Sequence, residues 1–456
     1  MEDLNTIIEE LRESLIDILR RWIAVPSIKG EPAPGAPYGL EVRRALDTAL
    51  ADAGKLGFAV RDIDGHAGDV RMGPLDQDPL GILVHLDVVP VGAGWQMDPF
   101  GGVLEGDRLY GRGASDDKGP AVAALLAMYA VKQAGIPLSR EVRLILGCDE
   151  ETGMDDMKYY AAQGLMPKTG FSPDASFPVI NTEKGLLHLE LRAHASTDGL
   201  PVKSIDVGER PNVVPGLATA LVYGDGALCA KVNKLAGDMH LQVEAEIAGD
   251  SLVKLTSTGI GGHAAYPESA RNANGQLLLM LRALGVTGVL KTLADCVGME
   301  YDGSSLGARC SDELSGPLTC NLGILRYGQD GCFATLDIRY PVLAYHERIV
   351  RSVRAALGAE IQVEVAAHKE PHHVPPNSPL VTALLDAYHE ETGRDRECVA
   401  TGGGTYARCL GEGVAFGSAF PEDEELAHQA GEYASIDGLM MNIRIFANAI
   451  VKLAGA

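Results

Sequence analysis

The first part of the chain has apolar residues at helical spacing. Between residues 3 and 24 they recur every three or four positions, which predicts an amphipathic helix over that range. These apolar residues are Leu4, Ile7, Ile8, Leu11, Leu15, Ile18, Leu19 and Trp22.

Short apolar runs follow, separated by a helical stretch. Residues 81–89 and 142–147 are bounded by Gly or Pro and read as strands buried on both faces. Residues 121–131 are apolar nearly all round and follow Gly119 and Pro120, which predicts a buried helix. Strands that alternate with helices in this way predict an α/β domain with a mainly parallel sheet.

From about residue 181 the pattern changes to alternating apolar and polar positions, which is typical of a half-exposed antiparallel sheet. The predicted strands cover 186–193, 241–247, 252–257 and 332–340, and helices are expected over 272–284 and from Leu380 onward. The predicted architecture is an α/β domain built from residues 1–181 and 372–456. An enlarged α+β domain of residues 182–371 is inserted into it.

Composition narrows the classes of function. The net charge of −23 disfavours nucleic acid and anionic membranes as partners. The chain begins with an acidic stretch rather than a basic one, and no apolar run approaches the roughly 20 residues that cross a bilayer. The 8 cysteines are scattered without a C-x-x-C pair, as in a reduced compartment. We expect a soluble cytoplasmic protein in which His, Asp and Glu carry any metal chemistry.

Several candidate chemical residues lie at predicted strand ends or turns. His85 and Asp87 stand two apart in the run 81–89, so on a strand their side chains would share a face at its carboxyl end. Asp116 and Asp117 precede the buried helix, where a helix cap explains them equally well. Taken alone, each pair is weak support for a metal site.

Three acids, Asp149, Glu150 and Glu151, come directly off the strand 142–147, where like charges repel unless a cation compensates them. A solvated loop is the alternative interpretation. Asp174 and His428 are weaker candidates, since His428 follows an acidic stretch and could be a surface residue. All these positions belong to one predicted domain and could converge on one crevice.

Five strings that carry these residues occur in a familiar order and spacing. They are HLDVVP, GRGASDDKGP, CDEETG, SPDASFP and AHQAGEY. The chain resembles the dinuclear-zinc peptidases that include aminoacylase, the glutamate-releasing carboxypeptidases and carnosinase. Within them it is most similar to the bacterial dipeptidases of the PepV, or Xaa-His dipeptidase, type. The resemblance covers nearly the whole chain.

The resemblance implies two Zn2+ ions per chain. His85 and Asp174 would be terminal ligands of one ion, Glu151 and His428 of the other, and Asp116 would bridge them. Three carboxylates and a bridging hydroxide would balance the charge of two divalent cations. Manganese or cobalt would also suit imidazole and carboxylate ligands without thiolate.

Catalytic roles also follow from the resemblance. Glu150 matches the general base, and Asp87 matches the carboxylate that orients His85. In the family the peptide bond between Asp116 and Asp117 is typically cis. Water activated between the metals would attack the scissile carbonyl while Glu150 moves its proton.

The inserted domain is expected to act as a lid over the substrate. The resemblance matches His263 to the lid histidine, Asn212 to a second substrate-facing residue and Arg339 to the residue that grips a terminal carboxylate. Without it, His263 reads as a surface loop histidine and Arg339 as an exposed arginine. The Gly-rich segment of residues 401–406 lacks the Lys-Ser/Thr ending of a phosphate loop, so nucleotide binding is not expected. By the resemblance, backbone N–H groups of this segment would help to hold the same carboxylate, at Gly403, Gly404 and Thr405.

The sequence therefore predicts a monomeric zinc dipeptidase for short unblocked dipeptides. An N-acyl or N-succinyl amino acid amidohydrolase of the same superfamily is the enzymatic alternative. A metal-dependent binding or scaffold protein that has lost its chemistry is the alternative from another class. It would be expected to lack a ligand or Glu150, and neither is missing.

Overall fold

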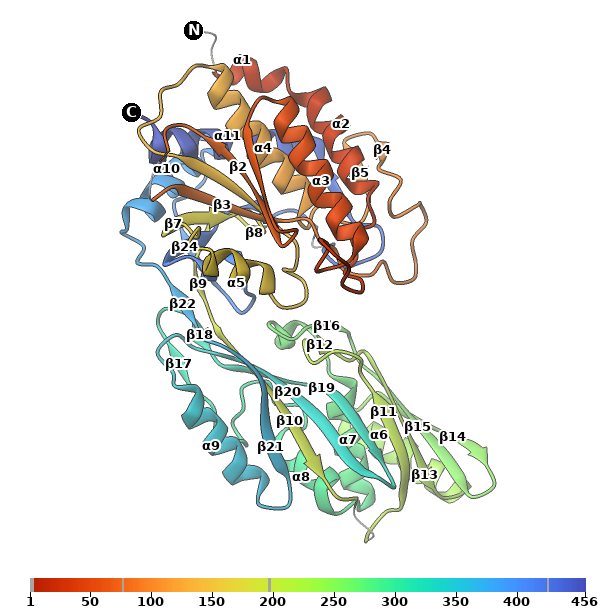
Figure 1. The fold of residues 1–456 in the computed structure, drawn as a ribbon. Coiled ribbons are helices and arrows are strands. Elements are labelled where there is room, and N and C mark those ends of the chain that lie inside the picture. The colour runs from red at the N-terminus through yellow and green to blue at the C-terminus, as the bar shows by residue number, and fades with distance from the viewer. Residues whose placement is uncertain (1–3, 76–77, 196–197, 425) are drawn as a thin grey trace. The chain divides into compact units, whose positions relative to one another are not determined.

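The computed structural model describes residues 4–75, 78–195, 198–424 and 426–456 (Figure 1). Residues 1–3, where the predicted first helix and first domain begin, lie outside the described residues. The chain divides into two compact units. The first unit holds the described residues of 1–181, 374–399 and 404–456, and the second holds those of 182–373 and 400–403. The chain thus returns to the first unit at residue 374, two residues after the predicted boundary at 372. Residues 400–403, which include Gly402 and Gly403, belong to the second unit.

A nine-stranded sheet organises the first unit, in the order β1-β2-β6-β3-β7-β24-β9-β22 with β23 paired to β9, although β22 and the residues of β9 that pair with it belong to the second unit. These strands are β1 (Ala59–Ile63), β2 (Ala67–Met72), β3 (Leu80–His85), β6 (Val142–Gly147), β7 (Thr169–Ser172), β9 (Val179–Glu183), β22 (His372–His373), β23 (Cys398–Thr401) and β24 (Glu412–Ala415). Parallel pairs join β3 to β6, β3 to β7 and β7 to β24. The pairs β1–β2, β2–β6, β24–β9 and β22–β9 are antiparallel. The fold is α/β with a sheet that is parallel at its centre and antiparallel toward both ends.

Shorter strands and the helices complete the first unit. The small strands are β4 (Val103–Glu105), β5 (Arg108–Tyr110), β8 (Ala175–Ser176), β25 (Ser418–Ala419) and β26 (Tyr433–Ser435). The helices are α1 (Leu4–Glu9), α2 (Arg12–Ile23), α3 (Leu40–Lys55), α4 (Lys118–Gln133), α5 (Asp155–Ala162), α10 (Pro379–Thr392) and α11 (Ile436–Ala454), with a 3-10 turn η2 (Tyr406–Cys409).

The predicted single helix over 3–24 is wrong, because two helices occupy this range. The N–H of Leu11 donates to the carbonyl of Ile8, which tightens the end of α1 before α2 begins. The apolar residues stay in phase across this turn, and both helices bury that face. Periodicity alone therefore could not reveal the break.

The central strands are buried on both faces because their side chains alternate between two cores. Ile82 and Val84 of β3 pack in a large core with α2, α4 and α11, whereas Leu83 packs on the opposite face with α5 and η2. Leu144 and Ile145 of β6 divide in the same way. The run 142–147 forms the strand predicted for it, whereas the run 81–89 is a strand only as far as His85, and both strands deliver their carboxyl ends to one edge of the sheet.

The second unit contains an eight-stranded antiparallel sheet in the order β14-β15-β13-β11-β19-β20-β10-β21. Its strands are β10 (Gly185–Ala193), β11 (Val202–Val207), β13 (Leu217–Tyr223), β14 (Val243–Gly249), β15 (Leu252–Thr258), β19 (Thr319–Gly328), β20 (Gly331–Tyr340) and β21 (Gln362–Lys369). Shorter elements are β12 (Val213–Val214), β16 (Gly262–His263), β17 (Ser311–Asp312), β18 (Gly316–Pro317) and η1 (Pro267–Ser269). Its helices are α6 (Gly226–Met239), α7 (Ala273–Leu284), α8 (Gly288–Cys296) and α9 (His346–Leu357).

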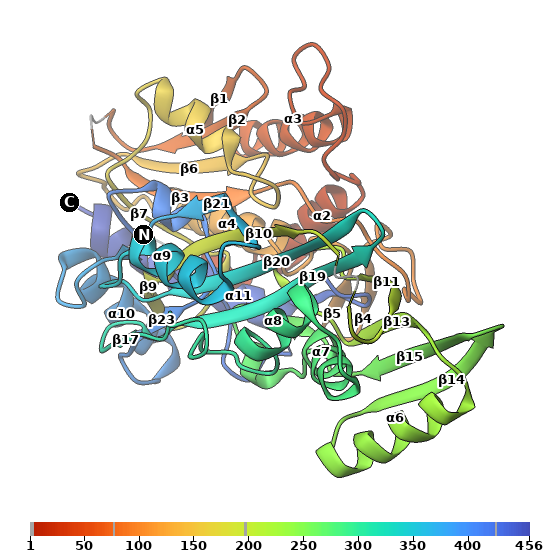
Figure 2. The same cartoon turned by 90° about the horizontal axis from the view of Figure 1, so that it is seen from below.

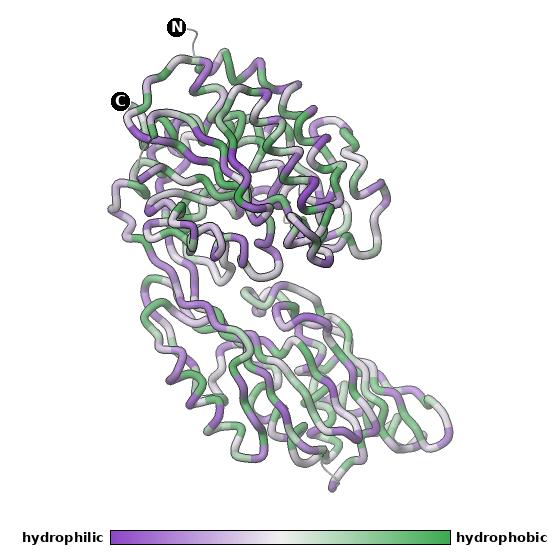
Figure 3. Tube along the Cα trace, in the orientation of Figure 1, coloured by the Kyte–Doolittle hydropathy of each residue, from purple (hydrophilic) through white to green (hydrophobic). Residues whose placement is uncertain are grey.

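The helices of the second unit cover one face of this sheet, with Leu277 of α7, Leu290 of α8 and Val353 of α9 in its core. Helix α6 lies beside β14, as Figure 2 also shows. Apolar and polar residues alternate along much of the chain (Figure 3). The polar face of β20 departs from the expected half-exposed sheet, because Thr335, Asp337 and Arg339 are all buried. No helix within the described ranges has the length and apolar character that crossing a membrane requires.

Candidate metal centre

His85 is the last residue of β3, and Asp87 lies beyond the strand. The prediction that both stand on one strand is therefore wrong, since the pairing with β6 stops at His85 and Gly147. Nδ1 of His85 lies 2.9 Å from the backbone oxygen of Asp87 and 3.5 Å from its carboxylate. Because a carbonyl oxygen can only accept, Nδ1–H is the donor and Nε2 is left unprotonated in the neutral ring, ready to bind a metal.

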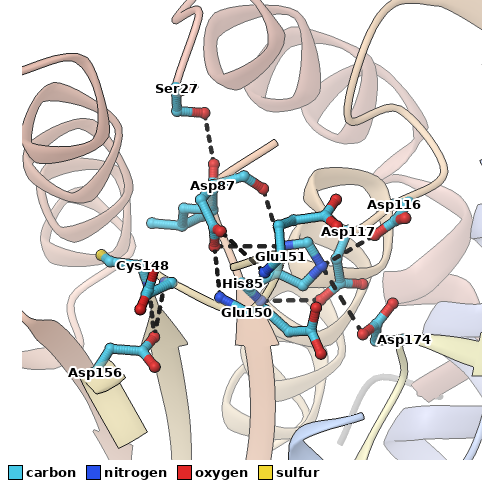
Figure 4. A network of polar contacts seen from close by, with 12 residues as sticks. Ser27, His85, Asp87, Asp116, Asp117, Cys148, Glu150, Glu151, Asp156 and Asp174 are labelled. Atoms are coloured by element: carbon cyan, nitrogen blue, oxygen red, sulfur yellow. Dashed lines mark hydrogen bonds and ion pairs between the residues drawn. The ribbon is translucent and has the colours of Figure 1, made fainter. Parts of the chain in front are cut away.

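Asp116 lies between two imidazoles. Its Oδ1 is 2.9 Å from Nε2 of His85, and its Oδ2 is 3.0 Å from Nε2 of His428. His428 is also 3.1 Å from Oε1 of Glu151, and Asp174 is 3.8 Å from Nε2 of His85. The structure thus brings all five candidate ligands together, with one oxygen of Asp116 toward each imidazole. Figure 4 shows four of them, together with Glu150. The peptide bond between Asp116 and Asp117 is cis, as the resemblance implies.

The carboxylate of Asp87 holds the acidic turn that follows β6. Oδ1 accepts the backbone N–H of Glu150 and Oδ2 accepts that of Glu151, each at 3.2 Å. Asp87 is buried with these bonds as its partners (Figure 4). It therefore fixes both the imidazole of His85, through its backbone oxygen, and the two glutamates, through its side chain.

A second buried carboxylate, Asp156, supports the same turn. It accepts the backbone N–H groups of Cys148 and Asp149 at 2.6 and 2.9 Å and the hydroxyl of Tyr406. The ring of Tyr406 lies against Gly147, where an added Cβ would stand 2.3 Å from the hydroxyl oxygen. Only glycine allows this approach, so the end of β6 and the start of the acidic turn are fixed together.

The acids of the cluster crowd one another. Burial raises the pKa of Glu150 to about 8, and the neighbouring Glu151, Asp87 and Asp116 act in the same direction. Burial and the charge of Asp116 likewise raise the pKa of Asp174. Burial would lower the pKa of His85, yet the surrounding carboxylates outweigh it and raise that pKa well above its usual value. These shifts indicate a strongly negative field that a bound cation would neutralise.

The donor set suits borderline divalent metals. Ligand atoms of His85, Asp116 and Glu151 lie within 4.8 Å of one another, and so do those of His85, Glu150 and Asp174. Two imidazoles with carboxylates and without thiolate fit zinc, manganese or cobalt better than magnesium. Glu150 belongs to the group with His85 and Asp174, so these distances alone do not decide whether Glu150 binds a metal or acts as a base.

Glu432 is a buried residue that the sequence reasoning did not single out. Its Oε1 accepts the backbone N–H groups of Gly113, Ser115 and Asp116 at 3.0 to 3.2 Å, and its Oε2 accepts Arg112 at 2.6 Å. The carboxylate thereby shapes the loop that presents Asp116. It lies inside the AHQAGEY string, but no feature of the sequence separated it from the other acids nearby.

The remaining candidate residues lie mostly in the second unit. Val213 of β12 pairs with His263 of β16, and the N–H of Ala264 donates to the carbonyl of Asn212, so Asn212 and His263 are brought side by side. His263 stands on a short two-stranded pair rather than in a plain loop. Nδ1 of His263 accepts the N–H of Ala265 at 3.2 Å.

Arg339 is held by a buried network. Its Nε and one terminal nitrogen donate to the two oxygens of Asp337 at 2.7 and 2.8 Å, and the other terminal nitrogen donates to the backbone oxygen of Gly402 at 2.8 Å. Asp337 also lies 2.8 Å from Nε2 of His188. The alternative interpretation, a plain exposed arginine, is wrong, because β10 and β19 flank β20 on both sides and its polar residues pair with one another.

The Gly-rich segment contains the boundary between the units. Gly403 belongs to the second unit, and its N–H donates to Oγ1 of Thr401 at 3.0 Å. Gly404 and Thr405 belong to the first unit, and Oγ1 of Thr405 accepts the N–H of Ala407 at the start of η2. The N–H of Gly403 is therefore already used within its own turn.

Comparisons with known proteins identify the family of the chain. Residues 81–452 match the family model described as Peptidase family M20/M25/M40. The chain is 36% identical over 467 residues to the "Putative dipeptidase YtjP" of Bacillus subtilis (strain 168), covering 99% of this chain and 100% of that protein. It is 31% identical over 465 residues to the "Beta-Ala-Xaa dipeptidase" of Lactobacillus delbrueckii subsp. lactis, covering 99% and 98%.

Solved structures show the same fold. Human carnosine dipeptidase 1 aligns with a TM-score of 0.62 at 14% identity, covering 99% of this chain and 98% of that chain. The five strings of the sequence, the converging ligands and the match over residues 81–452 agree with one another. The chain belongs to peptidase family M20/M25/M40.

Proposed function

We propose that the protein is a metal-dependent dipeptidase that hydrolyses short, unblocked dipeptides. The observation that carries this proposal is the convergence of His85, Asp116, Glu151, Asp174 and His428 beside Glu150. The similarity to the "Putative dipeptidase YtjP" of Bacillus subtilis and to the "Beta-Ala-Xaa dipeptidase" of Lactobacillus delbrueckii supports the same class of substrate.

Two Zn2+ ions would occupy the cluster, with manganese or cobalt as alternatives. His85 and Asp174 would hold one ion, Glu151 and His428 the other, and Asp116, which has one oxygen near each imidazole, would be shared by both. Bound there, two divalent ions lower the pKa of a shared water and polarise the scissile carbonyl.

Glu150 would act as the general base. Its buried carboxylate lies with His85 and Asp174 in one compact group, which would place it beside a water held at the metals. It would take a proton from the attacking water as the new carbon–oxygen bond forms. It would then deliver that proton to the amine nitrogen as the carbon–nitrogen bond breaks. Asp87 would keep Glu150 in place through the backbone N–H bond.

The second unit would act as a lid that supplies the substrate contacts. Arg339 is held in one orientation by Asp337 and retains N–H groups beyond the bonds described above, which suits it to a terminal carboxylate. His263 would donate to the oxygen of the scissile carbonyl, and Asn212 would contact the substrate beside it. The backbone N–H groups of Gly404 and Thr405 would also donate to the substrate carboxylate. The N–H of Gly403 could do so only after its hydrogen bond to Oγ1 of Thr401 breaks.

We further propose an active monomer in the cytoplasm. The second unit is enlarged, as in the dipeptidases of the PepV type, whose lid supplies its histidine from the same chain, and His263 would likewise serve the site of its own chain. None of the 8 cysteines, all of which lie within the described residues, is in a disulfide bond, which suits a reducing compartment. Size-exclusion chromatography with light scattering, combined with an activity assay on the monomer fraction, tests this point. Activity confined to a dimer fraction would contradict it.

A panel of substrates tests the dipeptidase proposal. Free dipeptides should be cut, activity should vanish on chelation and return with zinc, and peptides of four or more residues should resist cleavage. The panel also includes N-acetylated and N-succinylated amino acids. Preferential cleavage of these would favour the alternative, an N-acyl or N-succinyl amino acid amidohydrolase, whereas efficient cleavage of long peptides would contradict a substrate held at its carboxyl terminus.

A further inference from the structure

Two histidines and a glutamate of the second unit converge at the end of its edge strand. His346 is the first residue of α9, His368 lies on β21, and Glu370 follows β21 directly. One ligand atom from each residue lies within 4.8 Å of the other two. None of these residues belongs to the catalytic cluster or to the substrate contacts proposed above.

The spacing of the three side chains matches a metal site better than a hydrogen-bonded cluster. Oε1 of Glu370 is 3.7 Å from Nδ1 of His346 and 3.6 Å from Nε2 of His368. Both distances are longer than an N–H···O hydrogen bond, which spans roughly 2.7 to 3.2 Å. In a tetrahedral zinc site with bonds of about 2.0–2.1 Å, the ligand atoms stand about 3.4 Å apart. A carboxylate oxygen that faces two imidazole nitrogens at this separation leaves room for one ion between them.

A buried tyrosine contacts both His368 and Glu370. The hydroxyl of Tyr340 is 2.8 Å from Nε2 of His368 and 3.3 Å from Oε2 of Glu370, the carboxylate oxygen that does not face the imidazoles. Its ring lies across Gly185 of β10, where an added Cβ would stand 2.1 Å from the ring. Nε2 of His368 cannot hold this hydroxyl and a metal at once, so metal binding would leave Tyr340 to donate to Oε2 of Glu370, which would keep that carboxylate in place.

We propose that His346, His368 and Glu370 form an additional site for a borderline divalent transition metal such as Zn2+, Ni2+ or Cu2+. Two imidazoles and one carboxylate favour these ions over Mg2+ and Ca2+, which prefer oxygen ligands alone. The bound ion would join the start of α9 to the end of β21. It would also fix the segment after Glu370, which leaves the second unit at residue 373.

Metal stoichiometry of the full chain tests this site. The metal-free protein is titrated with ZnCl2 by equilibrium dialysis, and bound zinc is measured by mass spectrometry. The His346→Gln/His368→Gln variant should bind about one zinc per chain less than the wild type while its dipeptide hydrolysis is unchanged. Glu347→Gln, an exposed carboxylate beside His346, is the matched control and should bind as much zinc as the wild type. Equal uptake by the double histidine variant and the wild type would overturn the proposal.

A second background separates this site from the catalytic cluster. In Asp116→Ala, about one zinc per chain should remain, and adding the two histidine substitutions should remove it. Absence of zinc from Asp116→Ala, or zinc that survives the added substitutions, would refute the additional site whatever the outcome for dipeptide hydrolysis. Should the histidine variants fail to fold, Glu370→Gln gives the same readout, because its side chain is 70% exposed and tolerates substitution.

Discussion

The first unit gathers the carboxylates of Asp116, Glu151 and Asp174 around two imidazoles, and the ion pairs that the structure gives them are all with histidine. The second unit instead pairs the buried Asp337 with Arg339 and His188. Burial and like charge raise the pKa values of Glu151 and Asp174 in the first unit. In the second unit burial opposes ionisation of Asp337, but Arg339 and His188 outweigh it and hold the pKa of that carboxyl below its usual range.

The difference separates two uses of buried charge. A cluster whose acids cannot all ionise on their own is built for an external cation, whereas a cluster that carries its own cation is complete without one. Variants that remove charge from either cluster therefore test this difference between the two units. Effects on metal binding and chemistry are expected in the first unit, and effects on substrate affinity and acid stability in the second.

The largest effect is expected from Asp116→Ala. Removing the carboxylate that lies between His85 and His428 should abolish dipeptide hydrolysis and most zinc uptake at the catalytic cluster. Bound zinc and hydrolysis rate are measured together, with circular dichroism to confirm folding. Wild-type activity in a folded Asp116→Ala protein would reject the bridging role.

Glu150→Gln should lower kcat by roughly 10²- to 10⁴-fold, the usual contribution of a general base. Zinc content should stay near the wild-type level if Glu150 moves protons rather than binding metal. The measurement is kcat for a dipeptide alongside bound zinc. A parallel loss of zinc would show that Glu150 is a ligand, as its place in a compact group with His85 and Asp174 also permits.

Glu432→Gln should weaken zinc binding by roughly 10- to 100-fold, the cost often seen when a residue behind a metal ligand is lost. The amide keeps only one acceptor oxygen, so it cannot accept both the N–H groups of the loop of Asp116 and the guanidinium of Arg112, as the two oxygens of Glu432 now do. Excess zinc should restore much of kcat, which distinguishes positioning of Asp116 from a direct role in the chemistry. Glu424→Gln, an exposed acid of the same region, is the control and should behave as wild type. Zinc affinity that is unchanged in Glu432→Gln would contradict the positioning role.

Arg339→Lys should lower kcat/KM for free dipeptides by about 10- to 100-fold, because a charged hydrogen bond contributes roughly 1.5–3 kcal/mol. The loss should appear mainly in KM, and it should nearly disappear for dipeptide amides, which lack the terminal carboxylate. Arg326→Lys, at a half-exposed arginine on β19, serves as the matched control. An equal loss for amides and free dipeptides would argue that Arg339 maintains the fold and does not bind the carboxylate.

Acidification should destabilise the second unit through Asp337, with no effect near neutral pH. The folded pKa of Asp337 is lowered from the usual value of 3.8, so its contribution to stability is present above that value and is lost as pH falls through it toward the folded pKa. Urea unfolding is measured as a function of pH for the wild type and for Asp337→Asn. The variant should be less stable at neutral pH but should lose less stability on acidification. An identical pH dependence would contradict this assignment.

The candidate site was largely accessible from the sequence because its residues follow apolar runs whose pairing is dictated by burial. Strand β6 coincides with the predicted range 142–147, and β3 begins within one residue of its predicted start. Parallel strands deliver their carboxyl ends to one edge, so the order of the strings already placed His85 beside the acidic turn. Two local details escaped prediction as well: β3 ends at His85, and the first helix is broken before α2.

The sequence by itself determined the fold class, the family and the candidate ligands, since these depend on hydrophobic periodicity and on residue types in a fixed order. Only the tertiary structure decided which other residues hold the candidate ligands in place and which further side chains come together. Glu432 lies more than 300 residues from the loop whose N–H groups it accepts, and His346 meets His368 only because α9 begins beside the end of β21. Such pairings join distant parts of the chain, and no local pattern encodes them because they arise when the elements pack.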